Sequence, residues 1–176
     1  RKLRLRPGEQ LLDIGCGWGG LIMYAAKHYG VTALGVTLSP AQAELARERI
    51  AAAGLAAQCR VAICDYRELP PGEVFDKVVS VGMVEHVGRA QMSAYFAAAY
   101  RHTRPGGLFL NHGIVVATPT PSVLLARLQA RLWQQGAFIQ RYIFPDGELL
   151  PSGELISYAE TAGFELRDVE SLREHY

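Results

Sequence analysis

The sequence has little net charge, no long apolar run and few cysteines. Lys and Arg number 18 against 17 Asp and Glu, so the formal net charge of +1 gives no electrostatic reason to expect a nucleic-acid partner. No apolar run reaches the roughly 20 residues that cross a bilayer, so no transmembrane helix is expected. The three cysteines, Cys16, Cys59 and Cys64, are an odd number without C-x-x-C spacing, which argues against a disulfide framework or a metal site and favours a reducing cytoplasm.

The length and composition are those of one globular domain. With 176 residues, of which 49% are hydrophobic and 20% charged, the chain is long enough to bury a core of its own. The basic stretch 1–7 is followed by no long apolar segment, which is not typical of a signal peptide. Because the chain enters a strand almost at once and stops at Tyr176 without a closing element, we expect residues 1–176 to be a single domain within a longer protein.

Short apolar runs alternate with segments of helical periodicity. Strands are expected over residues 10–14, 31–38, 59–63, 74–81 and 108–116. Helices are expected between them over residues 19–29, 39–53 and 89–102. Ser39 before Pro40 is a typical helix start, and Gly30 a typical helix stop. This alternation predicts the α/β class, with a doubly wound, mostly parallel sheet.

The alternation breaks after the fifth expected strand. Residues 119–151 form an insertion, with an amphipathic helix over 122–135, which we expect to lie over the carboxyl edge of the sheet. A further helix over 152–161 and a late strand over 164–171 are expected to follow.

The most informative stretch is an apolar strand that ends in a glycine-rich turn, residues 11–20. Bare backbone at Gly15 and Gly17 can approach a nucleotide closely at the carboxyl end of the strand. Together with Gly20, these residues satisfy the G-x-G-x-x-G fingerprint of NAD-binding proteins. That site requires an acid at the end of the second strand, which this chain lacks. Asp13, just before the turn, can hold an ammonium group, which S-adenosylmethionine (SAM) has and NAD lacks.

Further segments complete a site for SAM. Gln42, one turn into the second helix, is either a ligand of the ribose hydroxyls or a solvated helix residue. Asp65 follows the third strand, where an acid can accept a hydrogen bond from an adenine amino group. The turn over 104–107 before the fifth strand also matches a recurrent feature of SAM-dependent methyltransferases. The predicted cofactor-binding residues are Asp13, Gly15, Gly17, Thr37, Leu38, Ser39, Gln42, Asp65, Tyr66 and Arg67.

A second group of polar residues follows the fourth and fifth strands. Glu85 and His86 come directly after an apolar run, where catalytic residues of such sheets commonly lie. His112 is a histidine inside an otherwise apolar strand. Each has a plain structural interpretation: a helix-start acid for Glu85 and a packed histidine for the other two. A histidine paired with a carboxylate on the neighbouring strand is instead a candidate active site.

In their order along the chain, these motifs resemble the cyclopropane-fatty-acyl-phospholipid synthase family, which includes the mycolic acid cyclopropane synthases. The resemblance covers nearly the whole chain in six stretches, at 12–20, 35–42, 64–67, 80–88, 112–114 and 142–147. The glycine turn is common to methyltransferases, whereas Glu-His-Val-Gly at 85–88 and Tyr-Ile-Phe-Pro-Asp-Gly at 142–147 are more specific. The resemblance implies a Rossmann-like, class I SAM-dependent methyltransferase with an insertion after strand five. It also implies that an N-terminal helical part and the final strands are missing from these residues.

The resemblance further implies a reaction and its residues. The family transfers the SAM methyl group to the cis double bond of an unsaturated acyl chain in a membrane phospholipid, and a bound bicarbonate takes a proton as the cyclopropane closes. Carried over by motif, Glu85, His112 and the backbone of Ile114 would hold the bicarbonate, and Tyr176 would match a family tyrosine. The family also uses a cysteine upstream of the glycine turn, and none of the three cysteines here lies at that place.

The implied partners are unsaturated phospholipid acyl chains at the membrane surface, with no nucleic acid. The expected location is cytoplasmic and peripheral at the inner membrane surface, and a homodimer is one arrangement compatible with it. Two alternatives stay open at this point. The same fold could methylate a small molecule without ring closure, or it could bind SAM without catalysis.

Overall fold

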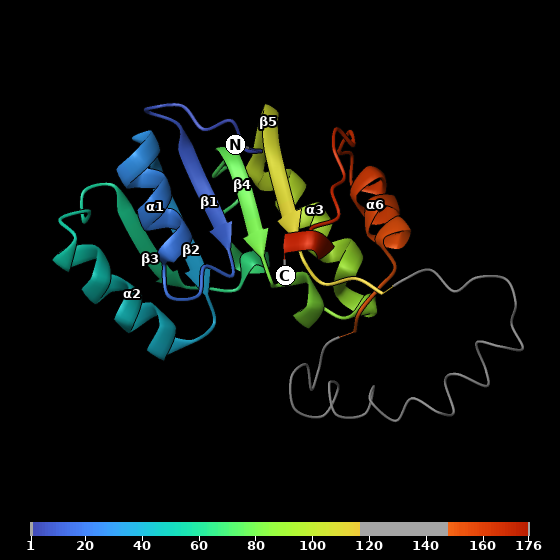
Figure 1. Ribbon diagram of the computed structural model, residues 1–176, viewed down its shortest axis with the longest axis horizontal. Helices are drawn as coiled ribbons and strands as arrows, with labels where there is room; N and C mark the ends of the chain where they lie inside the picture. The colour runs from blue at the N-terminus through green and yellow to red at the C-terminus, as the bar shows by residue number, and fades with distance from the viewer. Residues whose placement is uncertain (1, 117–147, 176) are drawn as a thin grey trace, which may run out of the picture.

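The computed structural model describes residues 2–116 and 148–175, which form a five-stranded sheet flanked by helices (Figure 1). The strands are β1 (Gln10–Ile14), β2 (Thr32–Thr37), β3 (Cys59–Ile63), β4 (Phe75–Val81) and β5 (Thr103–His112). All pairings are parallel, in the order β3-β2-β1-β4-β5. The predicted α/β class and parallel sheet are confirmed. Because the strand order reverses between β1 and β4, their carboxyl ends border the crevice where such sheets bind ligands.

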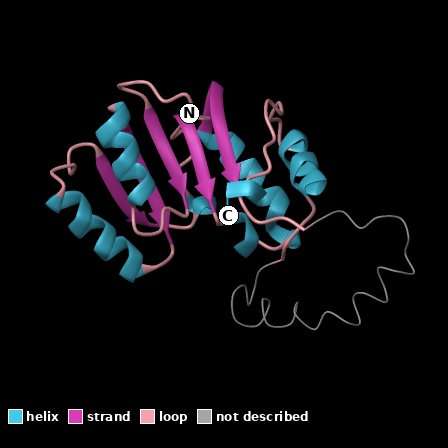
Figure 2. Ribbon diagram, in the orientation of Figure 1, coloured by secondary structure: helices cyan, strands magenta, loops and turns pink. Residues whose placement is uncertain are grey.

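Helices cover both faces of the sheet (Figure 2). On one face lie α1 (Gly20–Tyr29) and α2 (Pro40–Ala52). On the other lies α3 (Met92–His102), with α6 (Ser152–Thr161) packed against it. None of the helices in the described ranges is long and apolar enough to cross a membrane. The expected helix over 122–135, the motif at 142–147 and Tyr176 lie outside the described residues.

Alternation along the central strands divides the core into two clusters. Leu12 of β1 and Val78 of β4 are fully buried on the α3 face, whereas their neighbours Leu11 and Val79 are fully buried on the α1 and α2 face. Both faces of β1 and β4 are therefore buried at this level, which explains why adjacent apolar residues replace strict alternation there.

Gly35 of β2 allows the glycine turn to pack directly on the sheet. A Cβ at this position would lie 2.6 Å from both Cβ and Sγ of Cys16. We therefore expect Gly35→Ala to lower the free energy of unfolding by about 1–3 kcal/mol, because the core would be overpacked. Gly20→Ala is the matched control, since a Cβ there meets nothing within 4 Å and a helical alanine is favoured over glycine. Urea unfolding of both variants tests this, and equal stabilities would contradict it.

Two sequence expectations are wrong. The expected strand over 164–171 does not form, and Leu166 and Val169 in it are 45% and 60% exposed. An extended segment becomes a strand only where a neighbour supplies ladder hydrogen bonds. Side chains hold this one instead, because Phe164 stacks on Phe109 and Lys2 pairs with Asp168 and Glu170. The fifth strand was expected over 108–116 but spans Thr103–His112, because the residues of the expected 104–107 turn form an irregularity within it.

Candidate cofactor and active site

A cleft of about 540 Å³ opens at the carboxyl ends of β1 to β4, a volume typical of small-molecule sites. Nine of the ten residues predicted to bind the cofactor line it, namely Gly15, Gly17, Thr37, Leu38, Ser39, Gln42, Asp65, Tyr66 and Arg67. These residues come from three loops that are far apart in the sequence. The parallel sheet brings them together because all its strands end at the same edge. The tenth residue, Asp13, does not line the cleft and lies buried in β1, two residues before Gly15.

The glycine turn has a backbone that favours glycine. Gly15 has φ 80° and Gly17 has φ 53°, both in the left-handed region. A Cβ on Gly15 would also lie 2.8 Å from Cγ of Met83, which lines the same cleft. The backbone N–H groups of Gly15 and Cys16 both donate to the carbonyl of Val36, at 3.0 Å. The turn is thus fixed against β2, and its bare backbone faces the cleft.

The side chain of Asp13 is a buried acid with no hydrogen bond or ion pair among the described residues. Asp13 is the last residue but one of β1, and only 3% of it is exposed. Burial raises the pKa of its carboxyl from 3.8 to about 7, because the charged form loses its hydration. A carboxylate in such a position is complementary to a cationic ligand, which would restore its charge.

The loop after β2 is organised by side-chain hydrogen bonds. The Thr37 hydroxyl donates to Oε1 of Gln42 at 2.7 Å and accepts from the backbone N–H of Ser39 at 3.2 Å. The Ser39 hydroxyl in turn accepts from the N–H of Gln42 at 3.3 Å and caps α2. These bonds hold the Gln42 amide beside the cleft, with its NH₂ group available to a ligand hydroxyl.

The loop after β3 presents a carboxylate that is already paired. Both Asp65 oxygens accept hydrogen bonds from the Arg67 guanidinium, at 2.9 and 2.6 Å. This hydrogen bonding lowers the pKa of Asp65, so its charged form is favoured. Arg67 also lies over the ring of Tyr66, 5.7 Å from its centroid. A carboxylate oxygen has more than one lone pair, so Asp65 can still accept from a ligand amino group.

The far wall of the cleft comes from residues that sequence reasoning did not assign to the cofactor. These residues lie at the end of β4 and in the irregular segment after it, where the sequence has no regular periodicity. They are Val81, Gly82, Met83, His86, Val87 and Gln91. The exposed His86 thus borders the cofactor cleft, whereas its neighbour Glu85 points elsewhere. The sequence does place both residues directly after the fourth strand. That position alone does not show that His86 borders the cleft while Glu85 points away from it.

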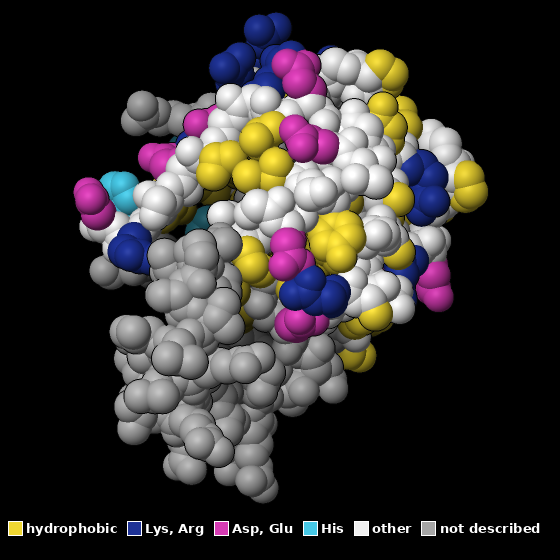
Figure 3. All heavy atoms as spheres, turned by 90° about the vertical axis from the view of Figure 1, so that its right-hand side faces the viewer, with side chains coloured by type: hydrophobic (Ala, Val, Ile, Leu, Met, Phe, Trp, Pro, Cys, Tyr) yellow, Lys and Arg dark blue, Asp and Glu magenta, His cyan; other side chains and the backbone are white. Residues whose placement is uncertain are grey.

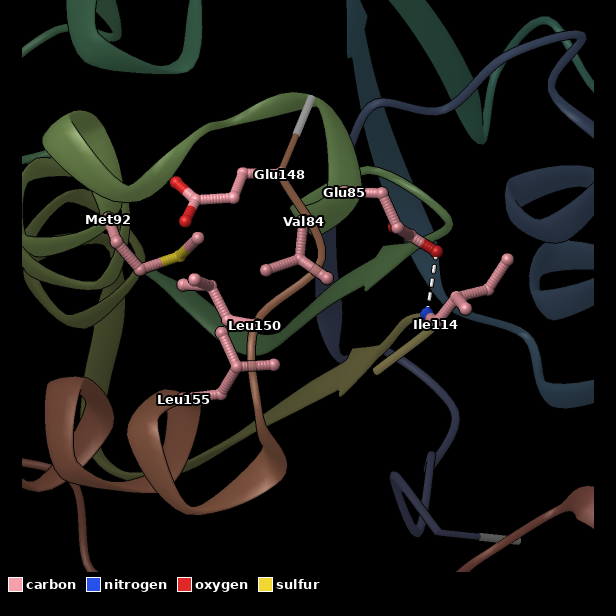
Figure 4. Close-up of a pocket in the computed structure, with 7 residues that line it drawn as sticks. All are labelled: Val84, Glu85, Met92, Ile114, Glu148, Leu150 and Leu155. Carbon is pink, nitrogen blue, oxygen red and sulfur yellow. Dashed lines mark hydrogen bonds between the residues drawn. The ribbon is translucent and has the colours of Figure 1, made fainter. Parts of the chain in front are cut away.

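Glu85 lies in a short 3-10 helix (η2, Val84–His86) and is 3% exposed. Its Oε1 accepts a hydrogen bond of 2.7 Å from the backbone N–H of Ile114, two residues beyond the end of β5 (Figure 4). His112, the last residue of β5, pairs with Val81 at the end of β4. The structure therefore brings Glu85, His112 and Ile114 to one corner, next to the cleft wall.

The second carboxylate oxygen of Glu85 is buried and accepts no hydrogen bond from any described residue. A Cβ on Gly113 would lie only 3.2 Å from it, so glycine at that position keeps the space beside this oxygen free of a side chain. An unpaired buried carboxylate oxygen is costly, so this corner is suited to a ligand that can donate a hydrogen bond to it.

The chain matches proteins of known class along its whole length. The family described as mycolic acid cyclopropane synthetase matches residues 1–176. A probable fatty acid methyltransferase of Pseudomonas putida is 47% identical over 176 residues, which cover 100% of this chain and 43% of that protein. The cyclopropane-fatty-acyl-phospholipid synthase of Escherichia coli K12 is 40% identical over 167 residues, which cover 95% of this chain and 39% of that protein.

A solved structure has the same architecture. Mycolic acid cyclopropane synthase CmaA1, complexed with SAH and CTAB, aligns with a TM-score of 0.86 and 32% identity over 99% of this chain and 61% of that one. The predicted Rossmann-like, class I methyltransferase fold is thereby confirmed. The chain spans only 43% and 39% of the two curated relatives. With the sheet, the cleft and these matches in agreement, the chain belongs to the mycolic acid cyclopropane synthetase family.

Proposed function

We propose that this chain forms the SAM-binding and proton-removing part of an enzyme acting on the cis double bond of an unsaturated phospholipid acyl chain. The enzyme transfers the SAM methyl group and closes a cyclopropane. The observation that carries the proposal is a ligand-sized cleft, with a buried acid behind its glycine turn and a second buried acid, Glu85, at the adjoining corner. Membership of the family supports the same reaction class.

The residues of the cleft fit SAM. The unpaired carboxyl of Asp13 is complementary to the ammonium group of the amino-acid moiety. Gly15 and Gly17 leave room for close approach, Gln42 can bind the ribose hydroxyls, and Asp65 can accept from the adenine amino group. SAM supplies a methyl group on a cationic sulfur, which is reactive enough for a nucleophile as weak as an alkene.

The corner around Glu85 fits the second half of the reaction. Methyl addition to an alkene leaves a carbocation, and loss of a proton from the new methyl group gives the electron pair that closes the ring. Glu85, His112 and the N–H of Ile114 would hold the bicarbonate that the resemblance implies, a base that the cation cannot turn into a stable ester with the protein. The unpaired Glu85 oxygen can accept from a hydroxyl-bearing anion, while the Ile114 N–H, which donates to the other Glu85 oxygen, can be shared with that anion.

The acyl chain would approach over the segment that follows β5. Ile114, Val115 and Val116 are 54%, 43% and 39% exposed, and they lead away from the Glu85 corner. An exposed apolar run beside a dry active site is suited to contact with a hydrocarbon chain. We propose accordingly that the protein works peripherally at the inner membrane surface in the cytoplasm, as a monomer or homodimer.

The test is incubation of the full-length protein with SAM and vesicles of a phospholipid bearing cis-unsaturated chains. We expect acyl chains that have gained CH₂ and lost the double bond, detected by mass spectrometry. Vesicles of the saturated phospholipid are the control and should consume no SAM. Turnover of SAM on a soluble small molecule, with the vesicle lipids unchanged, would refute the proposal.

A second candidate is methyl transfer to a fatty acyl chain without ring closure. The observation that favours it is the name of the Pseudomonas putida relative, a probable fatty acid methyltransferase. Both reactions begin with the same carbocation, and they differ in whether loss of a proton closes a ring or leaves a branched alkene. A branched product that keeps a double bond, formed from the same vesicles, would select this candidate and would reassign Glu85.

A further inference from the structure

Residues 148–151 connect the two elements that form the Glu85 corner. The backbone N–H of Glu148 donates to the carbonyl of Glu85 at 3.1 Å, and the carbonyl of Leu150 accepts from the N–H of Val116 at 3.2 Å. Leu150 is 2% exposed and belongs to the core, so this segment is firmly seated. Figure 4 shows Glu148 and Leu150 on this segment alongside Glu85 and Ile114. Glu85 is therefore held twice, through its backbone by Glu148 and through its side chain by Ile114.

Arg89 fixes the side chain of Glu148. It lies in a 3-10 helix (η3, Arg89–Gln91) that follows the Glu85 loop. Its Nε donates to Oε1 of Glu148 at 3.0 Å, and its backbone N–H donates to Oε2 at 3.3 Å. The same guanidinium also pairs with Glu154 of α6. One arginine thus joins three segments around the loop that carries Glu85. Figure 3 shows a face of the molecule on which basic and acidic side chains lie side by side.

This network affects the position of Glu85 more than it affects the stability of the fold. Arg89, Glu148 and Glu154 have side chains that are 47%, 42% and 39% exposed, and exposed ion pairs stabilise folds by at most about 1 kcal/mol. A closed ring of contacts through Glu148 nevertheless restricts where the carbonyl of Glu85 can lie. A shift of about 1 Å in a catalytic group can lower a rate by roughly a hundredfold.

We propose that Arg89 is a positioning residue that acts through Glu148 to hold Glu85 against Ile114. The inference rests on the proposed function, in which Glu85 takes part in proton removal. Nothing in the cleft that fits SAM involves Arg89 or Glu148. A loss of this contact should therefore lower kcat without weakening SAM binding.

The kinetic test uses the full-length protein with Arg89→Ala, Glu148→Ala, the double variant and the conservative Arg89→Lys. We expect kcat to fall roughly tenfold in either single variant and no further in the double variant, because one contact is lost in all three. Arg89→Lys should restore part of the rate, and the Kd for SAM should stay within about twofold throughout. The control Arg49→Ala removes an arginine on α2 and should change nothing. Multiplicative losses in the double variant, or a parallel loss of SAM binding, would overturn the proposal.

A second measurement does not depend on activity. In Arg89→Ala, amide hydrogen exchange should quicken at Glu148 and Ile114 but not in β1 or β2. Unchanged protection at these two amides would overturn the role of Arg89 even if the enzyme forms cyclopropanes. An inactive wild-type protein with the expected change in exchange would instead refute the proposed function and leave the contact established.

Discussion

Replacing Asp13 with asparagine should stabilise the unliganded protein and weaken its binding of SAM. The wild-type carboxyl is buried without a partner among the described residues, and its pKa is raised from 3.8 in water to about 7. Folding therefore takes up a proton between these two values, so the free energy of unfolding falls as the pH rises through this window and is flat above it. The full penalty is on the order of 4 kcal/mol. Asparagine carries no charge and avoids this penalty.

The stability gain of the asparagine variant should increase with pH, because only the charged form of Asp13 is destabilising. The stability gain of Asp13→Asn should be roughly 2–3 kcal/mol larger at pH 8 than at pH 5, measured as the difference from the wild type in urea unfolding. Subtraction of the wild-type curve removes the contribution of every other titrating group. A stability gain that is equal at the two pH values would show that folding does not raise the pKa of Asp13.

Binding of SAM should respond in the opposite direction. In the proposed complex the ammonium group restores the charge of Asp13, so the loss of one partner of a buried charge pair should weaken binding by roughly a hundredfold. Calorimetric titration of the full-length protein with SAM measures this change. A variant that gains stability but keeps wild-type affinity would exclude Asp13 from the cofactor site. The cleft would then need another partner for the ammonium group.

Replacing Glu85 with glutamine should abolish turnover while leaving SAM binding intact. The amide oxygen can still accept from the N–H of Ile114, so the loop should keep its place. An amide can neither share a proton with a bound anion nor carry negative charge beside a carbocation. We expect kcat to fall by roughly 10²–10⁴-fold. The Kd for SAM should stay within about twofold, since Glu85 does not line the cofactor cleft.

The matched control is Glu44→Gln, which neutralises an exposed glutamate on α2. It should leave both kcat and the Kd for SAM unchanged. If Glu85→Gln lost SAM binding together with activity, Glu85 would be part of the cofactor site or of the fold. If it kept wild-type activity, proton removal would have to be assigned to another group.

The sequence predicted the sheet and the cofactor cleft for the same reason. Buried parallel strands are continuous apolar runs, and each run ends at the edge where ligands bind. Gly15, Thr37 and Asp65 follow three successive runs, so the fold places them together without any long-range information. Glu85 follows β4 and His112 is the last residue of β5, so the two lie near one corner on the same grounds.

Features that depend on contacts between distant residues could not be predicted. The pairing of Arg89 with Glu148 joins residues 59 positions apart, and charged side chains carry no periodic signal. The cleft wall at Met83 and His86 lies in irregular backbone, where the spacing of apolar residues predicts no structure. The expected strand over 164–171 has strand-forming residues, but strand formation needs a neighbour that local sequence cannot reveal.

The most direct test of the whole account is the isotope content of the product formed from SAM with a fully deuterated methyl group. The full-length protein and unsaturated phospholipid vesicles are the other components. If a proton is removed from the transferred methyl group at the Glu85 corner, the ring carbon should keep two of its three deuterium atoms. An acyl product that keeps all three would contradict this account, because the transferred methyl group would never have lost a proton.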